Sequence, residues 1–241
     1  MVDYLRLEIR RTWRDGSYVV FTIGLPVLLY LLFSNVGDGP HDSARTRLTL
    51  MVGMAAYGGI GASLGNGSTV AEDKALGWLR QLRIVPLSPA KAVAGRMLTG
   101  MLVVLPAIAA VLLAGALVDD VKLDAGQWIG IAVLLWLGTA PFVLLGLGNG
   151  YWFSSSAANN ANMACTILLA VAGGLWIPVT DFPGWLAALA HWTPGHVYGA
   201  PSWTVADGST PGLTPFLTLA GWLALFAAWA VRAYRRASEY D

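Results

Sequence analysis

The sequence predicts an all-α fold, that of a polytopic membrane protein, and two observations carry this prediction. Of the 241 residues, 56% are hydrophobic and only 12% are charged, whereas soluble domains carry about 25% charged residues. The charges are also unevenly spread, and they leave long uncharged windows at 16–37, 48–71, 97–118, 125–180, 182–206 and 208–231. Because about 20 apolar residues cross the hydrocarbon core as a helix, the pattern excludes a water-soluble enzyme and a disordered chain.

The first element expected is an amphipathic helix at residues 3–15, lying in the headgroup plane. Apolar residues that include Trp13 recur every four positions, and Arg6, Arg10 and Arg14 follow on the adjacent stripe. This is the pattern of a basic helix at a membrane interface. A plain positively charged anchor before the first span is the alternative.

Six transmembrane helices are expected within a single transmembrane domain, 1–241. They cover about 18–36, 48–69, 90–118, 126–152, 158–178 and 213–233. Pro26 predicts a kink in the first span. Gly61 and Gly65 in the second form a G-x-x-x-G spacing, which permits close helix contact. Ser88 and Pro89 predict the start of the third, as an N-cap and a first-turn proline.

Two windows need separate treatment. The window 125–180 is too long for one helix, so we divide it at the polar stretch Ser154–Asn160. The window 182–206 contains Pro183, Pro194 and Pro201. Broken apolar backbone at membrane depth is tolerated only where protein shields it. We therefore expect residues 181–205 to form an outer re-entrant helical hairpin, followed by the sixth span and a short basic tail.

The basic residues predict the orientation. With a cytoplasmic N-terminus and six spans, twelve of the 15 Lys and Arg residues fall on the inner side and three, Arg45, Arg47 and Lys122, on the outer side. Such a bias is typical of cytoplasmic loops. Both termini and the charged interruption at 70–90 are therefore expected in the cytoplasm.

Several kinds of site are not expected in this chain. The sequence contains no G-x-x-x-x-G-K-[ST] loop, so the chain cannot bind ATP in the P-loop manner. His191 and His196 lack a third close metal ligand, and no metal site is predicted. The spans hold almost no ionisable residues, which argues against an ion-driven transporter. Nothing indicates nucleic acid as a partner.

The charged interruption contains a candidate docking helix, the coupling segment, which we define as residues 71–86. Leu79 and Leu82 can share one face while Arg80 and Arg83 share another, and Pro86 ends the pattern. A rigid amphipathic helix on the cytoplasmic side suits docking to a partner. An ordinary charged loop is the alternative.

Two motifs carry a family resemblance. The stretch AEDKALGWLRQLRIVPLSPAKAVAGRML resembles the cytoplasmic loop of ABC type-2 exporter permeases. Its matching positions are Glu72, Asp73, Lys74, Gly77, Leu79, Leu82, Pro86–Pro89, Gly95 and Arg96. The stretch 173–200 is similar to the outer signature of the same family, with Thr193-Pro194 in place of the usual Asn-Pro.

The resemblance implies the membrane subunit of an ATP-driven exporter. A second permease chain and two cytoplasmic ABC ATPase subunits would be its partners, with ATP and Mg on the ATPases and no cofactor on this chain. The residues expected to couple to the ATPase are Glu72, Asp73, Gly77, Trp78, Leu79, Arg80, Leu82, Arg83 and Pro86. The outer hairpin would shape the exit through Pro178, Phe182, Pro183, Trp185, Pro194 and Tyr198.

The implied setting is a bacterial plasma membrane, with lipid around the spans. The cargo stays open, because drugs, peptides, lipids, glycolipids and natural products are all compatible with this resemblance. Three other classes also remain: an ion-independent secondary transporter, an intramembrane enzyme, and a membrane anchor or sensor subunit. A neighbouring or co-purifying ATPase would separate the exporter from all three.

Overall fold

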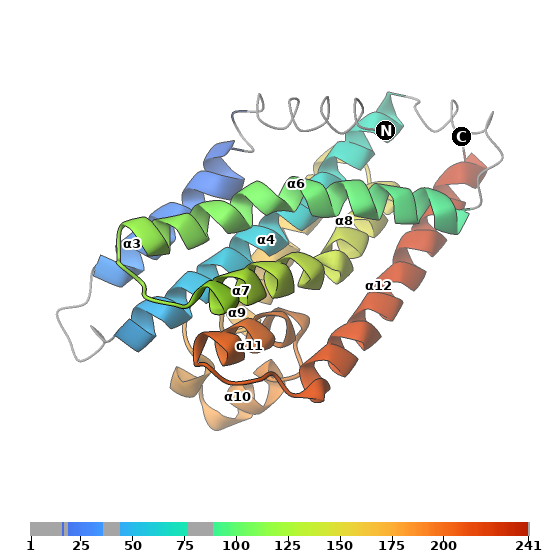
Figure 1. Cartoon of the computed structure of the whole chain (residues 1–241). Helices are drawn as coiled ribbons and strands as arrows, with labels where there is room; N and C mark the ends of the chain where they lie inside the picture. The colour runs from blue at the N-terminus through green and yellow to red at the C-terminus, as the bar shows by residue number, and fades with distance from the viewer. Residues whose placement is uncertain (1–15, 17–18, 36–43, 77–88, 241) are drawn as a thin grey trace.

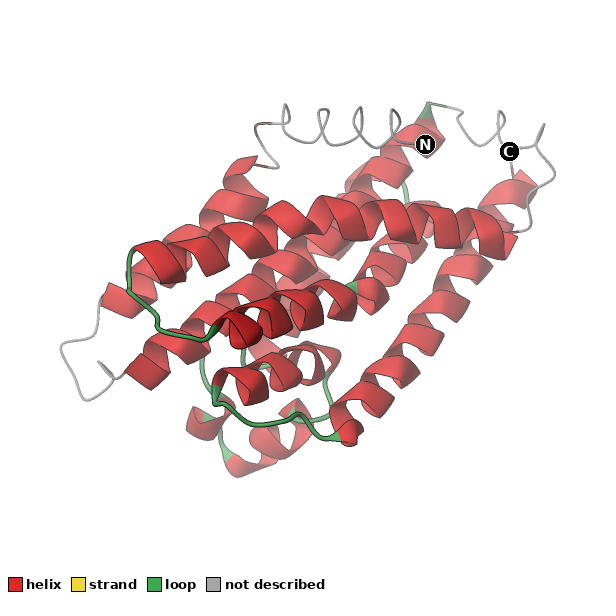
Figure 2. Ribbon diagram, viewed as in Figure 1, coloured by secondary structure: helices red, strands yellow, loops and turns green. Residues whose placement is uncertain are grey.

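The computed structural model describes residues 16, 19–35, 44–76 and 89–240. Every regular element in these ranges is a helix, as Figure 2 shows, so the predicted all-α class is confirmed. The amphipathic helix expected at 3–15 and most of the coupling segment lie outside the described residues.

Four helical stretches within the described ranges are long and apolar enough to cross a membrane. They lie in α4 (Ala44–Ala75), in α6 (Pro89–Leu117), in α7 (Ala125–Gly138) with α8 (Ala140–Trp152), and in α12 (Leu213–Tyr240). The first predicted span holds a shorter apolar helix, Thr22–Asn35, and the fifth holds the more polar α9 (Ser155–Ala172). The apolar helices establish a membrane protein, while the count of six spans stays a prediction.

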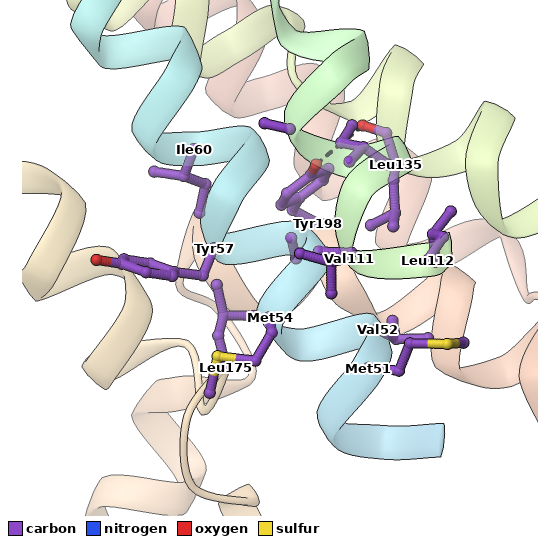
Figure 3. Packing of buried hydrophobic residues seen from close by; sticks show 14 of the residues in the cluster. Met51, Val52, Met54, Tyr57, Ile60, Val111, Leu112, Leu135, Leu175 and Tyr198 are labelled. Carbon is purple, nitrogen blue, oxygen red and sulfur yellow. Dashed lines mark hydrogen bonds between the residues drawn. The ribbon is translucent and has the colours of Figure 1, made fainter. Parts of the chain in front are cut away.

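Helix α4 runs through the middle of the bundle (Figure 1). In an apolar 18-residue window of α4, 78% of the residues are buried, compared with 11% for α12. Small residues dominate this helix, and they let neighbouring backbones approach closely. Helices α3 (Leu25–Asn35), α6, α8 and α9 all pack on it. Figure 3 shows its residues Met51, Met54 and Ile60 within the main hydrophobic core.

The first and fourth predicted spans each contain a change in helical geometry. A π-helical turn, Val19–Gly24, precedes α3, so the helix changes type next to Pro26. In the fourth span α7 ends at Gly138 and α8 begins at Ala140. Pro141 explains this break, because a proline has no N–H and clashes with the carbonyl four residues earlier. The predicted span 126–152 did not include this break.

Two predicted boundaries differ from the observed helices. Helix α9 ends at Ala172 rather than at 178, because Gly173 packs against the backbone of Gly195 and Gly174 adopts φ +69°. Only glycine takes this left-handed conformation readily. At the other end of the chain α12 continues to Tyr240, so the residues expected as a basic tail are helical.

The G-x-x-x-G spacing of Gly61 and Gly65 permits a close helix contact, but the structure has close contacts at other glycines. A Cβ atom added to Gly65 would meet nothing within 4 Å. At Gly67, by contrast, an added Cβ would overlap the backbone of Gly146, and one at Gly150 would overlap the carbonyl of Gly67. A close backbone contact therefore joins α4 to α8, and the G-x-x-x-G spacing did not identify it.

The segment expected as the outer hairpin consists of short elements. They are the 3-10 turn η2 (Val179–Asp181), α10 (Gly184–Ala190) and α11 (Pro194–Ala206). The longest has 13 residues, too few to span about 30 Å of hydrocarbon at 1.5 Å per residue. Trp203 Nε1 donates to Thr49 O over 3.1 Å, and Gln127 Nε2 donates to Val205 O over 3.1 Å. These bonds fix α11 beside the first turns of α4 and α7.

Candidate functional site

The coupling segment begins in the last turn of α4, at the end of the bundle opposite the outer hairpin. Glu72 is exposed, and Leu76 is 84% exposed, whereas Asp73 and Lys74 are partly buried. The expected coupling residues that lie outside the described part are Gly77, Trp78, Leu79, Arg80, Leu82, Arg83 and Pro86. Their role as docking residues stays a prediction.

Asp73 joins α4 to the first turns of α6. Arg96 Nη2 donates to Asp73 Oδ2 over 3.0 Å, and the two side chains are only 13% and 18% exposed, respectively. Pairs shielded from water are screened less than surface pairs, and loss of one partner leaves an uncompensated charge. Asp73 therefore has a partner within its own chain, while Glu72 faces outward.

Lys74 joins α4 to the carboxyl end of α8. Its Nζ atom donates to three backbone oxygens: Phe153 O at 2.6 Å, Tyr151 O at 2.8 Å and Gly150 O at 3.2 Å. The last carbonyl groups of a helix lack intrahelical partners and carry the negative end of the helix dipole. A lysine ammonium supplies three hydrogen-bond donors for these carbonyl groups and a positive charge beside the negative end of the dipole.

The start of α9 reaches the same turn of α4. Ser155 Oγ donates to Ala71 O over 3.1 Å, and only Phe153 and Ser154 separate α8 from α9. We name the last turn of α4, Ala71–Lys74, with its bonded partners on α6, α8 and α9, the α4 junction. It brings the root of the coupling segment into direct contact with three other helices.

Aromatic side chains bring α12 to the same end of α8. The rings of Trp152 and Trp229 have centroids 4.9 Å apart, and Arg236 lies over Trp152, 3.9 Å from its centroid. Stacking of an arginine on a tryptophan is favourable. The carboxyl end of α8 is thus held by α4 on one side and by α12 on the other.

A ladder of polar side chains crosses the bundle one to two turns from the junction. Asn149 Nδ2 donates to Asn162 Oδ1 over 2.8 Å, Asn162 Nδ2 donates to Ser68 Oγ over 3.2 Å, and Trp229 Nε1 donates to Asn149 Oδ1 over 3.3 Å. The two asparagines are buried, where partners for polar groups are required. The ladder ties α4, α8, α9 and α12 together.

The outer-hairpin residues divide into exposed and buried groups. Pro178 and Phe182 flank η2, and Pro183 is the N-cap of α10. Trp185 on α10 is exposed. Pro194 is the buried first residue of α11, where a proline is well tolerated. The structure therefore gives these residues different surroundings rather than one shared site.

Tyr198 of the outer hairpin is buried in the bundle. Its hydroxyl donates to Leu135 O over 2.9 Å, as Figure 3 shows. At the α7–α8 break the Thr139 amide bonds Trp136 O instead of Leu135 O, so the tyrosine satisfies a carbonyl that the break leaves open. Gly59 and Gly138 leave room for the Tyr198 side chain, because a Cβ atom on either would collide with it.

The two hairpin histidines contact each other. His191 Nδ1 lies 3.0 Å from His196 Nε2, and His196 Nδ1 lies 3.3 Å from Gly173 O. Burial and the nearby His191 lower the pKa of His196, which lies outside the predicted spans. Among the residues that the structure describes, no group of three or more His, Cys, Asp or Glu side chains is placed to hold a metal ion.

Comparison with known proteins places these features in a family. Residues 4–199 match the family model described as "ABC-2 type transporter". The chain belongs to the ABC-2 type transporter family. This membership confirms the resemblance drawn from the coupling and outer motifs. The matched residues include both the α4 junction and Tyr198.

A curated relative of this ABC-2 chain is similar over nearly its whole length. It is the Bacillus subtilis (strain 168) protein named "Putative transport permease YvfS", 24% identical over 221 residues, with 91% of this chain and 90% of the relative covered. The protein is therefore a membrane-embedded transport permease, and its family implies an ABC ATPase as a partner.

The ABC-2 motifs did not reveal what anchors the root of the coupling segment. Lys74 matched the motif only as part of an acidic–basic cluster, yet its acceptors lie 76 to 79 residues away. Lysine in a last helical turn normally interacts with its own helix end. No local sequence rule pairs Lys74 with carbonyl groups that lie so far along the chain.

Proposed function

We propose that this chain is the membrane-spanning subunit of an ATP-driven ABC exporter. It moves a hydrophobic or amphipathic substrate, such as a drug, natural product, lipid or glycolipid, out of the cytoplasm or the inner leaflet. The observation that carries the proposal is membership of the ABC-2 family by a chain whose sequence holds no P-loop. ATP and Mg²⁺ would then bind to the partner ATPase.

Docking to the ATPase is assigned to the coupling segment. Leucine and tryptophan side chains would supply the buried anchors, here Trp78, Leu79 and Leu82, while Arg80 and Arg83 would supply rim charges. Anchors commonly contribute 2 kcal/mol or more to an interface, and rim charges contribute less. The exposed Glu72 and Leu76 at the root of the segment support this assignment. Two ATPase copies would serve two permease chains.

The second permease chain would pack against apolar faces of the first and fifth predicted spans. Exposed side chains on α3, such as Leu28 and Phe33, and on α9, such as Met163 and Leu168, support this choice. Cross-linking in active membranes should capture a homodimer or a heterodimer. Membranes that transport but yield only monomers would contradict a paired permease.

Both termini and the coupling segment are proposed to face the cytoplasm of a bacterial cell. Support comes from the twelve-to-three distribution of basic residues, which is typical of this topology. A single cysteine in place of the exposed Ala75, in a Cys165→Ala background, should react with a membrane-impermeant reagent only from the inside. Reaction from the outside would overturn the orientation.

The predicted spans hold almost no ionisable residues, which argues against transport driven by an ion gradient. An ion-independent secondary transporter or a membrane anchor and sensor subunit would not require an ATPase, and each remains an alternative. Purifying the chain together with any ABC ATPase encoded by a neighbouring gene, and assaying ATP hydrolysis across a panel of apolar compounds, separates these alternatives. An exporter should bind the ATPase stably and show stimulation by its substrate. A chain that transports in proteoliposomes without any ATPase would contradict the proposal.

A further inference from the structure

The α4 junction lies between the root of the coupling segment and the connection from α8 to α9. Lys74 is one residue beyond Asp73, which pairs with Arg96, and it bonds Tyr151 O just before that connection and Phe153 O within it. Ser155, immediately after the connection, bonds Ala71. The last turn of α4 therefore holds both sides of the α8–α9 connection.

The three bonds of Lys74 constrain its ammonium in direction as well as in distance. The acceptors are the backbone oxygens of Gly150 and Tyr151, in the last turn of α8, and of its C-cap residue Phe153, between 2.6 and 3.2 Å away. Charge-assisted hydrogen bonds are shorter and stronger than neutral ones. A displacement of Lys74 along α4 must therefore either move the end of α8 or break several bonds at once.

A displaced end of α8 would not move alone. Asn149, in its last turn, bonds Asn162 on α9 over 2.8 Å, and the close contact of Gly67 with Gly146 and Gly150 leaves no gap between α4 and α8. Packed interfaces of this kind shift as units rather than deform continuously. Motion at the coupling segment thus has a continuous route of bonded contacts into α9.

We propose that Lys74 is a positioning residue that transmits nucleotide-dependent movement of the coupling segment to the α8–α9 connection. The inference rests on the proposed function, because it requires an ATPase docked on the coupling segment. It assigns Lys74 a role distinct from the docking residues. Loss of Lys74 should leave the ATPase bound while α9 no longer responds to nucleotide.

The test uses Ser156, an exposed residue in the first turn of α9. Ser156→Cys in a Cys165→Ala chain, purified with its ATPase, is reacted with a maleimide in ADP and again with ATP trapped by vanadate. The ratio of the two rates reports the response of α9. This ratio is compared between the wild-type, Lys74→Met and Lys74→Arg chains. Lys122→Met is the control, because Lys122 belongs to an exposed ion pair beyond the far end of α6.

Lys74→Met should reduce the nucleotide-dependent rate ratio about tenfold, toward unity. The charged hydrogen bonds that this substitution removes contribute a free energy that corresponds to about this factor. ATPase co-purification should be unchanged. Lys74→Arg should restore the response, since guanidinium also donates to carbonyls, and Lys122→Met should resemble the wild type.

Three results would overturn the inference. They are a Lys74→Met chain with the wild-type ratio, a Lys74→Arg chain no better than Lys74→Met at equal thermal stability, and a wild-type ratio of one although the ATPase is bound. A wild-type chain that binds no ATPase would instead contradict the proposed function, and with it this inference. The amount of bound ATPase therefore distinguishes the two failures.

Discussion

Tyr198 connects the outer hairpin to a break in the bundle through one hydrogen bond. Its side chain is buried, its hydroxyl donates to Leu135 O, and its ring packs beside Phe142 with centroids 5.2 Å apart. The break at Thr139 leaves that carbonyl without its usual helical partner. A buried carbonyl that loses its donor costs about 1–3 kcal/mol.

Tyr198→Phe should therefore lower the free energy of unfolding by about 1–3 kcal/mol, measured by denaturant titration in detergent. The aromatic ring stays, so the loss reports the hydroxyl alone. Tyr57→Phe is the matched control, because the Tyr57 hydroxyl has no hydrogen bond within the described part of the chain. Equal stability of the Tyr198→Phe and Tyr57→Phe variants would remove this role for the hydroxyl.

His196 gives the outer hairpin a dependence on pH. Burial and the neighbouring His191 lower the pKa of His196 below its ordinary value of 6.5. Between the lowered pKa and 6.5 the unfolded chain binds a proton that the folded chain does not, so stability decreases as pH falls through this range. The contribution is fully present above pH 6.5.

Thermal unfolding at a series of pH values tests the effect. The midpoint of the wild-type chain should fall as the pH decreases below 6.5, and His196→Asn should show a smaller decrease, because asparagine does not titrate. Carboxylates contribute equally to both curves. Identical pH dependence in the two proteins would show that His196 does not supply it.

At the scale of elements, the contact between α4 and α8 depends on glycines. A Cβ atom at Gly67 would overlap the Gly146 backbone, which cannot move aside as a flexible side chain could. Gly65, on the same helix, has nothing within 4 Å of an added Cβ. The pair offers a matched test of the helix contact.

Gly67→Ala should destabilise the folded protein by about 1–3 kcal/mol, because it overpacks a close contact. Gly65→Ala should stay within about 1 kcal/mol of the wild type or stabilise it, since alanine is the better helix former. Denaturant titration of both variants measures the difference. A Gly67→Ala protein as stable as Gly65→Ala would contradict the packing of α4 against α8.

The sequence predicted the helices whose ends are marked by a change in hydropathy. It missed the features that leave hydropathy unchanged. Apolar windows bounded by charge or proline mark helices such as α6, which begins at the expected Pro89. The break at Thr139 follows from Pro141 inside an apolar window, where hydropathy does not change. The Gly67 contact and the acceptors of Lys74 depend on which helices become neighbours, and hydropathy and spacing do not carry that information.

At the scale of the whole molecule, two polar clusters lie at opposite ends of an apolar bundle. The α4 junction holds α4, α6, α8 and α9 together at one end, while α11 joins α4 and α7 at the other. Exposed apolar side chains lie on α3, α9 and α12, for example Leu32, Leu168 and Leu217, as expected for contact with lipid or a second chain. This arrangement suits a permease that receives movement at one end and changes shape along its length.

Docking of the coupling segment on an ABC ATPase is best tested with the double variant Trp78→Ala/Leu79→Ala. Two quantities are measured: association with the co-purified ATPase, and nucleotide-driven activity in membranes. Leu117→Ala is the control, because it truncates an apolar side chain that is 80% exposed at the far end of α6. Loss of two anchors should release the ATPase or uncouple hydrolysis from transport, while the chain still inserts. Unchanged ATPase association and unchanged transport in the double variant would contradict the account.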